Sequence, residues 1–206
     1  MFDTQLFSSG IDIYIATICS IIVTGVFLRM SFAYTKKRAK RKFSQGKQPA
    51  PSITSFRNLS KILFLTSMLL SLASYWLSSA LPLQINPTPL LQLFGACIVL
   101  YGCIRLEHAF SNLGNNYSPL FEAYLPFELI TQGAYSVIRH PIYLYNLFVS
   151  FGLAISSGSG LVAMNAIIGL IFILKTIHLE EGYLAENFPD YYNYKKQTWR
   201  LIPHVY

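Results

Sequence analysis

Five apolar runs constrain the fold of this chain of 206 residues more than any other feature. They extend over residues 13–28, 62–81, 90–104, 142–155 and 161–177. A membrane-spanning helix needs about 20 predominantly apolar residues, and each run approaches or reaches that length. The composition agrees, because 53% of the residues are hydrophobic and only 12% are charged, whereas soluble proteins have roughly 25% charged residues. The sequence therefore predicts an all-α integral membrane protein with about five transmembrane helices.

The last two runs are separated only by residues 156–160, which are all Ser or Gly. Such a segment is typical of a turn, so the sequence predicts that the last two helices form a hairpin. The first of them, 142–155, is short for a full span and is expected to be shallow or tilted. An antiparallel hairpin returns the chain to the side that it left. We therefore expect the C-terminal tail on the same side of the membrane as Arg139.

The basic residues predict the orientation, because Lys and Arg are retained on the cytoplasmic side during insertion. If the N-terminus is outside and the five helices alternate, the outer segments are residues 1–12, 82–89 and 156–160, and none contains Lys or Arg. All 16 basic residues then lie at or inside the cytoplasmic boundary. The sequence therefore predicts an outside N-terminus and a cytoplasmic C-terminus. A signal peptide at residues 13–28 is disfavoured, because it would need a basic segment before the apolar run.

We divide the chain into an N-terminal three-helix membrane region, residues 1–110, and a C-terminal region, residues 111–206. The first contains a basic cytoplasmic loop, predicted at residues 29–61. Basic residues in such a loop contact anionic lipid headgroups at about 1 kcal/mol each. Topology and lipid contact therefore explain the net charge of +7 without a nucleic-acid partner.

Small polar residues recur at spacings of four, three and four in the second run, at Ser67, Ser71, Ser74 and Ser78. This spacing places them on one face of a helix, where small side chains let helices pack closely in lipid. The three cysteines, Cys19, Cys97 and Cys103, lie within apolar runs and have no C-x-x-C spacing. We interpret them as buried thiols and expect no metal site.

The fourth run is preceded by Arg139, His140 and Pro141. Proline is favoured at the first position of a helix, and it excludes the residue before it from the α-helical region. His140 is therefore predicted to be the residue at which the helix starts. The next backbone N–H groups, from Ile142 onward, have no partner within the helix, and the helix dipole favours an anion there. A carboxylate or phosphate could bind at this point; a plain helix start with a basic anchor is the alternative.

Glu180 and Glu181 follow the last apolar run. The hairpin would return them to the neighbourhood of His140 and Tyr143. Carboxylates beside tyrosine rings can hold a cation by Coulomb attraction and by contact with the ring faces, although a solvated helix end is the simpler alternative. An anion site and a cation site side by side favour a zwitterionic cofactor that carries positive charge.

The C-terminal half, from about residue 113 to residue 206, contains a series of spaced motifs. They are G-x-Y, H-P-x-Y, E-E, L-x-x-x-F-x-x-Y-x-x-Y and R-x-I-P, formed by Gly133, Tyr135, His140, Pro141, Tyr143, Glu180, Glu181, Leu184, Phe188, Tyr191, Tyr194, Arg200, Ile202 and Pro203. With these motifs the chain resembles the isoprenylcysteine carboxyl methyltransferase family and related membrane methyltransferases. The N-terminal half is similar only in being hydrophobic.

The resemblance implies that S-adenosylmethionine binds on the cytoplasmic side, beneath a tunnel that opens to the membrane for a lipophilic acceptor. It implies cofactor contacts from Phe127, Glu128, Leu129, Ile130, Tyr135, Arg139, His140, Pro141, Ile142, Tyr143 and Glu180. The methyl group would move by in-line displacement at the sulfonium, and an ionised carboxylate acceptor would need little help from a base. The candidate catalytic residues are His178, Glu180, Glu181 and Arg200, and the first three are the candidate bases for an amine or thiol acceptor.

One position departs from the family pattern. The family has an Arg four residues before the first Glu, where it is expected to contact the carboxylate of a prenylcysteine acceptor. This chain has Thr176 there, between Lys175 and the nearby His178. The methyl acceptor can therefore be a prenylcysteine-like carboxylate, and a phospholipid, an amine or a thiol are the alternatives.

Two other classes of protein are alternatives. The ending at Arg200–Pro203 with Tyr206 also resembles membrane sterol reductases, which take hydride from NADPH. Those chains are longer, and their phosphate-rich cofactor favours more basic residues than Arg139, Lys175 and Arg200. A non-catalytic membrane scaffold would have no need of a His-Pro helix start beside paired carboxylates. The endoplasmic reticulum and the bacterial inner membrane are both compatible with the sequence.

Overall fold

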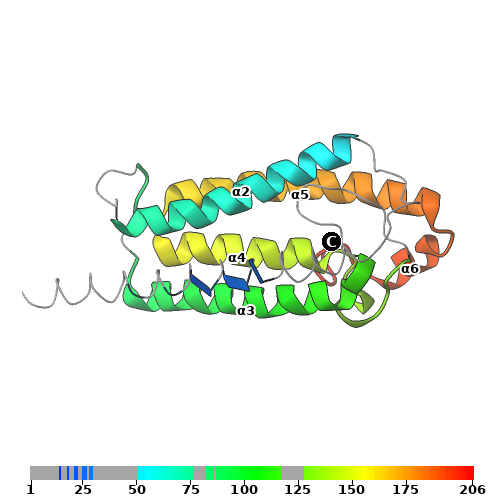
Figure 1. The fold of residues 1–206 in the computed structure, drawn as a ribbon, viewed down its shortest axis with the longest axis horizontal. Coiled ribbons are helices and arrows are strands. Elements are labelled where there is room, and N and C mark those ends of the chain that lie inside the picture. Colours follow the sequence, from blue (N-terminus) through cyan, green and yellow to red (C-terminus); the bar gives the residue numbers. More distant parts are fainter. Residues whose placement is uncertain are drawn as a thin grey trace, which may run out of the picture.

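The computed structural model describes residues 51–76, 82–85, 87–116 and 128–206, together with isolated positions between residues 14 and 29. Its regular elements within these ranges are helices: α2 (Pro51–Trp76), α3 (Pro89–Leu113), α4 (Pro141–Ser157), α5 (Gly160–Asn187) and α6 (Tyr191–Gln197), with short 3₁₀ helices η1 (Gly114–Asn116) and η2 (Gly133–Ser136). Figure 1 shows α2 to α5 as an elongated bundle with α6 at one end. In this bundle α4 packs against α2, α3 and α5.

The predicted fold class is confirmed for the described part of the chain. By length and composition, α2, α3 and α5 can each cross a membrane, whereas α4 is shorter, with 17 residues. The predicted hairpin is confirmed as α4 and α5, and it turns at Gly158, whose φ of +64° is in the left-handed region that glycine favours. The first predicted helix, residues 13–28, lies almost entirely outside the described residues. The number of spans and the orientation stay predictions.

Two predicted boundaries are wrong. Helix α2 begins at Pro51, so residues 51–61 are helical and do not belong to a basic loop. Helix α5 continues to Asn187, so Glu180 and Glu181 lie within a helix and not after it. Both differences have one cause. An apolar run marks only the part of a helix that can lie in the hydrocarbon core of a membrane. A helix extends further into its polar flank when the backbone hydrogen bonds continue.

Two of the segments that were predicted to lie on the outer side of the membrane, residues 82–89 and 156–160, are in contact through their described residues. Residues 82–85 run along the hairpin tip, where the Ile85 N–H donates to the Gly158 carbonyl at 2.9 Å and the Gly160 N–H donates to the Leu83 carbonyl at 2.8 Å. The Gln84 side chain donates to the Ser157 carbonyl at 2.6 Å. The α2–α3 connection and the α4–α5 turn therefore lie at one end of the bundle, as the alternating topology requires.

Helices α3 and α4 approach each other through glycines. A Cβ atom on Gly95 would lie 2.5 Å from the backbone nitrogen of Ser156, and one on Gly152 would lie 2.9 Å from the carbonyl oxygen of Gly95. Small residues at a helix contact allow backbones to approach this closely, which is a main source of helix association in lipid. This contact fixes α4 against α3.

The serine face of α2 is confirmed, since Ser67, Ser71 and Ser74 are all buried, with at most 2% exposed. Ser78 lies outside the described residues. The interpretation of the cysteines is correct for Cys103, which is buried, and wrong for Cys97, which is exposed. Cys97 faces away from the α3–α4 contact, and an apolar position on a spanning helix can face lipid as well as protein. Cys19 lies outside the described residues.

The glycine contact gives a testable prediction. We expect Gly95→Ala to destabilise the protein by about 1–3 kcal/mol, because the added methyl group would overlap the α4 backbone. Gly182→Ala is the matched control, since a Cβ there has no atom within 4 Å and alanine favours a helix by about 1 kcal/mol. The midpoint of thermal unfolding in neutral detergent measures both. Equal midpoints for the two variants would contradict the close α3–α4 contact.

Candidate functional site

A buried carboxylate, that of Glu181 in α5, contacts basic side chains from three parts of the chain. Its Oε1 atom accepts a hydrogen bond from Arg139 Nε at 2.8 Å, and its Oε2 atom accepts one from Arg200 Nε at 3.0 Å. Lys195 Nζ lies 3.7 Å from Oε2. The side chains of Arg139 and Glu181 are 5% and 3% exposed. Such a buried pair is stable only with good geometry and further hydrogen bonds, and both are present.

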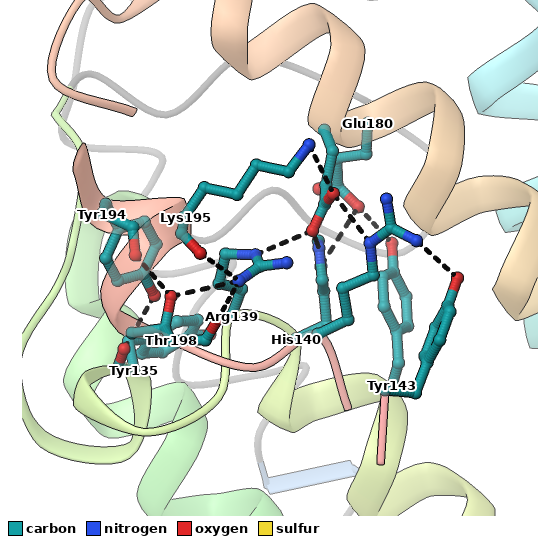
Figure 2. A network of polar contacts seen from close by, with 11 residues as sticks. Tyr135, Arg139, His140, Tyr143, Glu180, Tyr194, Lys195 and Thr198 are labelled. Carbon is teal, nitrogen blue, oxygen red and sulfur yellow. Dashed lines mark hydrogen bonds and ion pairs between the residues drawn. The ribbon is translucent and has the colours of Figure 1, made fainter. Parts of the chain in front are cut away.

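The C-terminal tail is attached to the segment before α4 by its backbone. The N–H groups of Arg139 and His140 donate to the carbonyls of Trp199 and Arg200 at 2.8 and 3.1 Å. Arg139 Nη1 also donates to the Lys195 carbonyl at 3.2 Å and to the Thr198 carbonyl. Figure 2 shows Arg139 between Thr198 and the α5 carboxylates. The tail and the start of α4 therefore form one unit with α5.

Glu180 shares only the contact with His140 with its neighbour Glu181. Its Oε2 atom accepts a hydrogen bond from the Tyr143 hydroxyl at 2.9 Å and lies 3.9 Å from His140 Nδ1. Its side chain is 30% exposed and lines a pocket. Consecutive residues of a helix point about 100° apart, so one carboxylate faces the tail and the other faces the pocket.

His140 precedes Pro141, the first residue of α4, and the predicted helix start is confirmed. Its ring stacks on the ring of Tyr143, with centroids 5.7 Å apart and an interplanar angle of 22°. Nε2 lies 3.5 Å from Glu181 Oε1. The histidine therefore lies between both carboxylates, with 6% of its surface exposed. The structure thus brings the helix start and the acidic pair together, as the hairpin geometry required.

Tyr135 is held on the pocket wall from two sides. The Asn112 side chain of α3 accepts a hydrogen bond from the Ala134 N–H at 2.8 Å, beside Gly133, whose φ is +62°. The Tyr194 hydroxyl of α6 donates to the Tyr135 carbonyl at 2.7 Å. Burial raises the pKa of Tyr194, so this hydroxyl keeps the proton that it donates.

The pocket lies between α2, α3, α4 and α5, and its lining has a polar and an apolar part. Its polar end is lined by Asn116, Glu128, Tyr135, His140, Tyr143, Glu180 and Tyr191, and its interior by Phe64, Leu106, Phe110, Leu147, Ala166 and Ile173. It has about 210 Å³ of water-accessible volume, whereas a single buried water needs about 10–15 Å³ of such volume. The pocket is therefore large enough for an organic molecule with a polar and an apolar part.

Most of the predicted site residues line the pocket, and the others lie behind it, on another face of α5 or outside the described residues. Those that line the pocket are Glu128, Leu129, Ile130, Tyr135, Arg139, His140, Ile142, Tyr143 and Glu180. Glu181 and Arg200 form the ion network behind it, and Pro141 is the buried start of α4. His178 is exposed and is not among the lining residues, since it lies on another face of α5. Phe127 lies outside the described residues.

Several lining residues were missed in the sequence. Arg57 and Lys61 of α2 had been assigned to a loop, and Asn146, Ser150 and Asn165 lie within apolar helices. A usable signal was present, because Arg57 and Lys61, like Asn146 and Ser150, are four residues apart and thus share a helix face. The sequence did not show which face would meet a pocket.

Comparisons with known proteins agree with the motifs. A family model described as phospholipid methyltransferase matches residues 87–191, which is more than half of the chain. Cobalt-zinc-cadmium resistance protein CzcN of Cupriavidus metallidurans is 35% identical over 80 residues, which are 37% of this chain and 36% of that protein. Protein-S-isoprenylcysteine O-methyltransferase of Dictyostelium discoideum is 31% identical over 120 residues, 54% of this chain and 49% of that protein.

A third relative is the nickel-cobalt-cadmium resistance protein NccN of Alcaligenes xylosoxydans xylosoxydans. It is 35% identical over 81 residues, which are 38% of this chain and 37% of that protein. The chain thus matches between about a third and a half of the length of these relatives.

The two adjacent carboxylates give a testable prediction. Glu181→Gln would leave Arg139 buried without its counter-charge, so we expect a loss of about 3–5 kcal/mol of stability. The matched variant Glu180→Gln removes a charge that is partly exposed, and we expect a loss of about 1 kcal/mol or less. Thermal unfolding in neutral detergent compares the two. An equal loss in both variants would contradict the division between a structural and a pocket-facing carboxylate.

Proposed function

The chain belongs to the phospholipid methyltransferase family, and from this premise we propose that it transfers a methyl group from S-adenosylmethionine to a lipophilic acceptor. One observation carries the proposal. A single pocket joins the polar group of His140, Tyr143 and Glu180 to an apolar space between α2, α3, α4 and α5. A water-soluble cofactor and a lipid-soluble acceptor need such a pair of environments side by side.

The polar end suits the charges of the cofactor. Glu180 Oε1 is a carboxylate oxygen that can accept hydrogen bonds from the ammonium group. The rings of Tyr135 and Tyr143 can contact the sulfonium through their faces. The first backbone N–H groups of α4, beginning at Ile142, can donate to the cofactor carboxylate, because they have no partner within the helix. S-adenosylmethionine supplies the electrophilic methyl group, and these residues bind and orient it.

The apolar end suits the acceptor. Phe64 of α2, Leu147 of α4 and Ile173 of α5 come from three different helices, so a chain held among them lies within the membrane-spanning part of the bundle. The family description and the name of the Dictyostelium relative support a lipid or a lipidated acceptor. A prenylcysteine-like carboxylate and a phospholipid headgroup are both compatible with this space.

Catalysis would depend mainly on position. Holding the acceptor atom in line with the methyl–sulfur bond and excluding water supplies most of the acceleration in such a transfer. For an amine or thiol acceptor, Glu180 is the proposed base, because it faces the pocket. Glu181 and Arg200 are proposed as positioning residues that hold Arg139 and the tail. His178 has no part in this proposal, since it is exposed.

The protein is an integral membrane protein, and we propose that the polar end of its pocket faces the cytoplasm. The proposal rests on the distribution of basic residues. It is supported by an ion pair between Arg29 and Glu107 of α3, which places the end of the first apolar run beside the end of the third. The membrane itself can be the endoplasmic reticulum or the bacterial inner membrane.

Titration of the purified full chain in neutral detergent tests the cofactor. We expect saturable binding of S-adenosylmethionine and none of NADPH. Glu180→Gln should weaken binding roughly tenfold or more, because a charged hydrogen bond to the ammonium is lost. Glu186→Gln is the matched control, since Glu186 is exposed on the same helix and does not line the pocket. Saturable binding of NADPH alone would favour a reductase, and binding of neither would favour a scaffold.

A further inference from the structure

The C-terminal tail, residues 198–206, folds back along the hairpin of α4 and α5. Its Leu201 side chain is buried in one apolar cluster with Ile173 and Ile177 of α5, and Leu147 of α4 packs against this cluster. Leu147 lies about 9 Å along α4 from the start of the helix. Figure 1 shows the C-terminus beside α4 and not beyond α6. The tail therefore lies beside the part of the hairpin that is apolar in sequence.

The tail passes from polar to apolar surroundings within one residue. Arg200 donates to the Glu181 carboxylate in the polar network, whereas the next residue, Leu201, packs with Ile173. Ile173 lies in the apolar run 161–177 of a helix that can cross a membrane. The boundary between the hydrocarbon core and the polar layer of the membrane therefore passes through the tail.

The outer side of the tail carries a patch of exposed apolar side chains, here called the tail patch. Trp199, Ile202 and Val205 are 40%, 48% and 75% exposed, and Val137 is 54% exposed. These residues adjoin, since the Trp199 N–H donates to the Val137 carbonyl at 3.0 Å and the Val205 N–H donates to the Ile202 carbonyl at 3.1 Å. Such patches mark sites of contact with a membrane or with another protein.

The tail forms a closed turn that can enter an apolar layer. The N–H groups of Leu201 and Ile202 donate to the Tyr206 carbonyl at 2.9 and 3.1 Å, and the Tyr206 N–H donates to the Ile202 carbonyl at 3.0 Å. Arg200 Nη1 donates to the Tyr206 hydroxyl at 3.1 Å. Backbone groups that are paired within the segment avoid the cost of leaving water. The turn thus presents the tail patch without exposing these polar groups to lipid.

The charge next to the tail patch favours a lipid surface as its partner. Lys195 and Lys196 precede the patch and are exposed, and the Lys196 ammonium lies 4.4 Å from the centroid of the Tyr192 ring. The sequence has no acidic residue after Asp190. Trp and Tyr are enriched at the boundary between membrane and water, and Lys and Arg near that boundary are attracted to anionic headgroups.

We propose that the tail patch is embedded in the membrane leaflet at this end of the bundle. Its side chains lie among the upper parts of the acyl chains, and Lys195 and Lys196 lie at the level of the lipid phosphates. The partner is the phospholipid bilayer itself. The patch continues the lipid-facing surface of the spanning helices, because Leu201 connects the turn to α5. The inference goes beyond the proposed function and does not depend on it.

This anchor supports the wall of the pocket. Tyr143, Leu147 and Ile173 line the pocket and also belong to the cluster that contains Leu201. The tail therefore backs the pocket wall from outside. A tail that is held by lipid keeps both this wall and the Arg200 side chain in position.

The depth of Trp199 in a bilayer tests the proposal. The chain contains two tryptophans, Trp76 and Trp199, so Trp76→Phe leaves one fluorescent reporter in the tail patch. This variant of the full chain is placed in nanodiscs of phosphatidylcholine and phosphatidylglycerol. The lipids carry a nitroxide quencher on the headgroup, high on the acyl chain or near the end of the acyl chain.

We expect the strongest quenching from the nitroxide that is high on the acyl chain. Iodide in the buffer should quench Trp199 severalfold less than it quenches N-acetyltryptophanamide in water. Strong quenching by iodide with none by any of the nitroxides would overturn the proposal. So would quenching that is strongest from the end of the acyl chain, because Trp199 would then lie in the hydrocarbon core and not at the boundary.

Variants of the tail patch test its apolar contact. In the Trp76→Phe background, Ile202→Asn and Val205→Asn should each lower the quenching by lipid nitroxide and raise the quenching by iodide severalfold. Both side chains are exposed in the fold, so the midpoint of thermal unfolding in neutral detergent should stay unchanged. Tyr192→Asn is the control, since Tyr192 is an equally exposed aromatic residue of α6 outside the patch. An equal effect of the control would overturn the assignment to the tail patch.

The lipid composition tests the basic residues, and native membranes test the alternative partner. Nanodiscs without phosphatidylglycerol should leave Trp199 more accessible to iodide, and Lys196→Gln should reduce this difference between the two lipids. Equal accessibility in both lipids would overturn the role of the lysines. If iodide reaches Trp199 freely in nanodiscs but not in native membranes, a protein covers the patch, and the proposal of a lipid partner is wrong.

Discussion

The site depends on one buried interaction, the carboxylate of Glu181 between Arg139 and Arg200. It joins three segments that are far apart in the sequence, namely the start of α4, the end of α5 and the C-terminal tail. The backbone bonds from Arg139 and His140 to the tail strengthen the same connection. Because Glu181 is fixed in this network, the rotation of α5 about its axis is fixed too, and Glu180 is directed to the pocket. Glu181 thereby offsets part of the basic charge of the tail behind the site.

The rest of the bundle complements this arrangement. The glycine contact between α3 and α4 places α4 in a fixed position and leaves no space between these helices at Gly95 and Gly152. Space is left further along α4, where residues of α2, α3 and α5 line the pocket with it. One face of α4 therefore serves packing and another serves binding. The same holds for α5, on which Glu181 serves structure and Glu180 faces the pocket.

Local signals in the sequence predicted some of this. The proline at position 141 fixed the start of α4, and the short Ser-Gly segment fixed the hairpin, so the proximity of His140 to Glu180 followed. What depends on tertiary packing was not predictable. Two adjacent glutamates are equivalent in sequence, and only the position of the tail makes one of them structural. Arg57 and Lys61 were assigned to a loop because the apolar run begins after them, although the helix does not.

The position of the pocket follows from the demands of its two proposed ligands. A cofactor with a sulfonium and an ammonium group is costly to bring into hydrocarbon, so its site must lie near the end of the bundle, where polar side chains and the tail surround it. A lipophilic acceptor has the opposite preference and is most stable among the spanning helices. Transfer requires both at contact distance, which is possible only at the boundary between the two environments. Glu180 and Tyr143 on one side, with Arg57 and Lys61 on the other, mark that boundary, because each belongs to a helix that continues into the apolar part of the bundle.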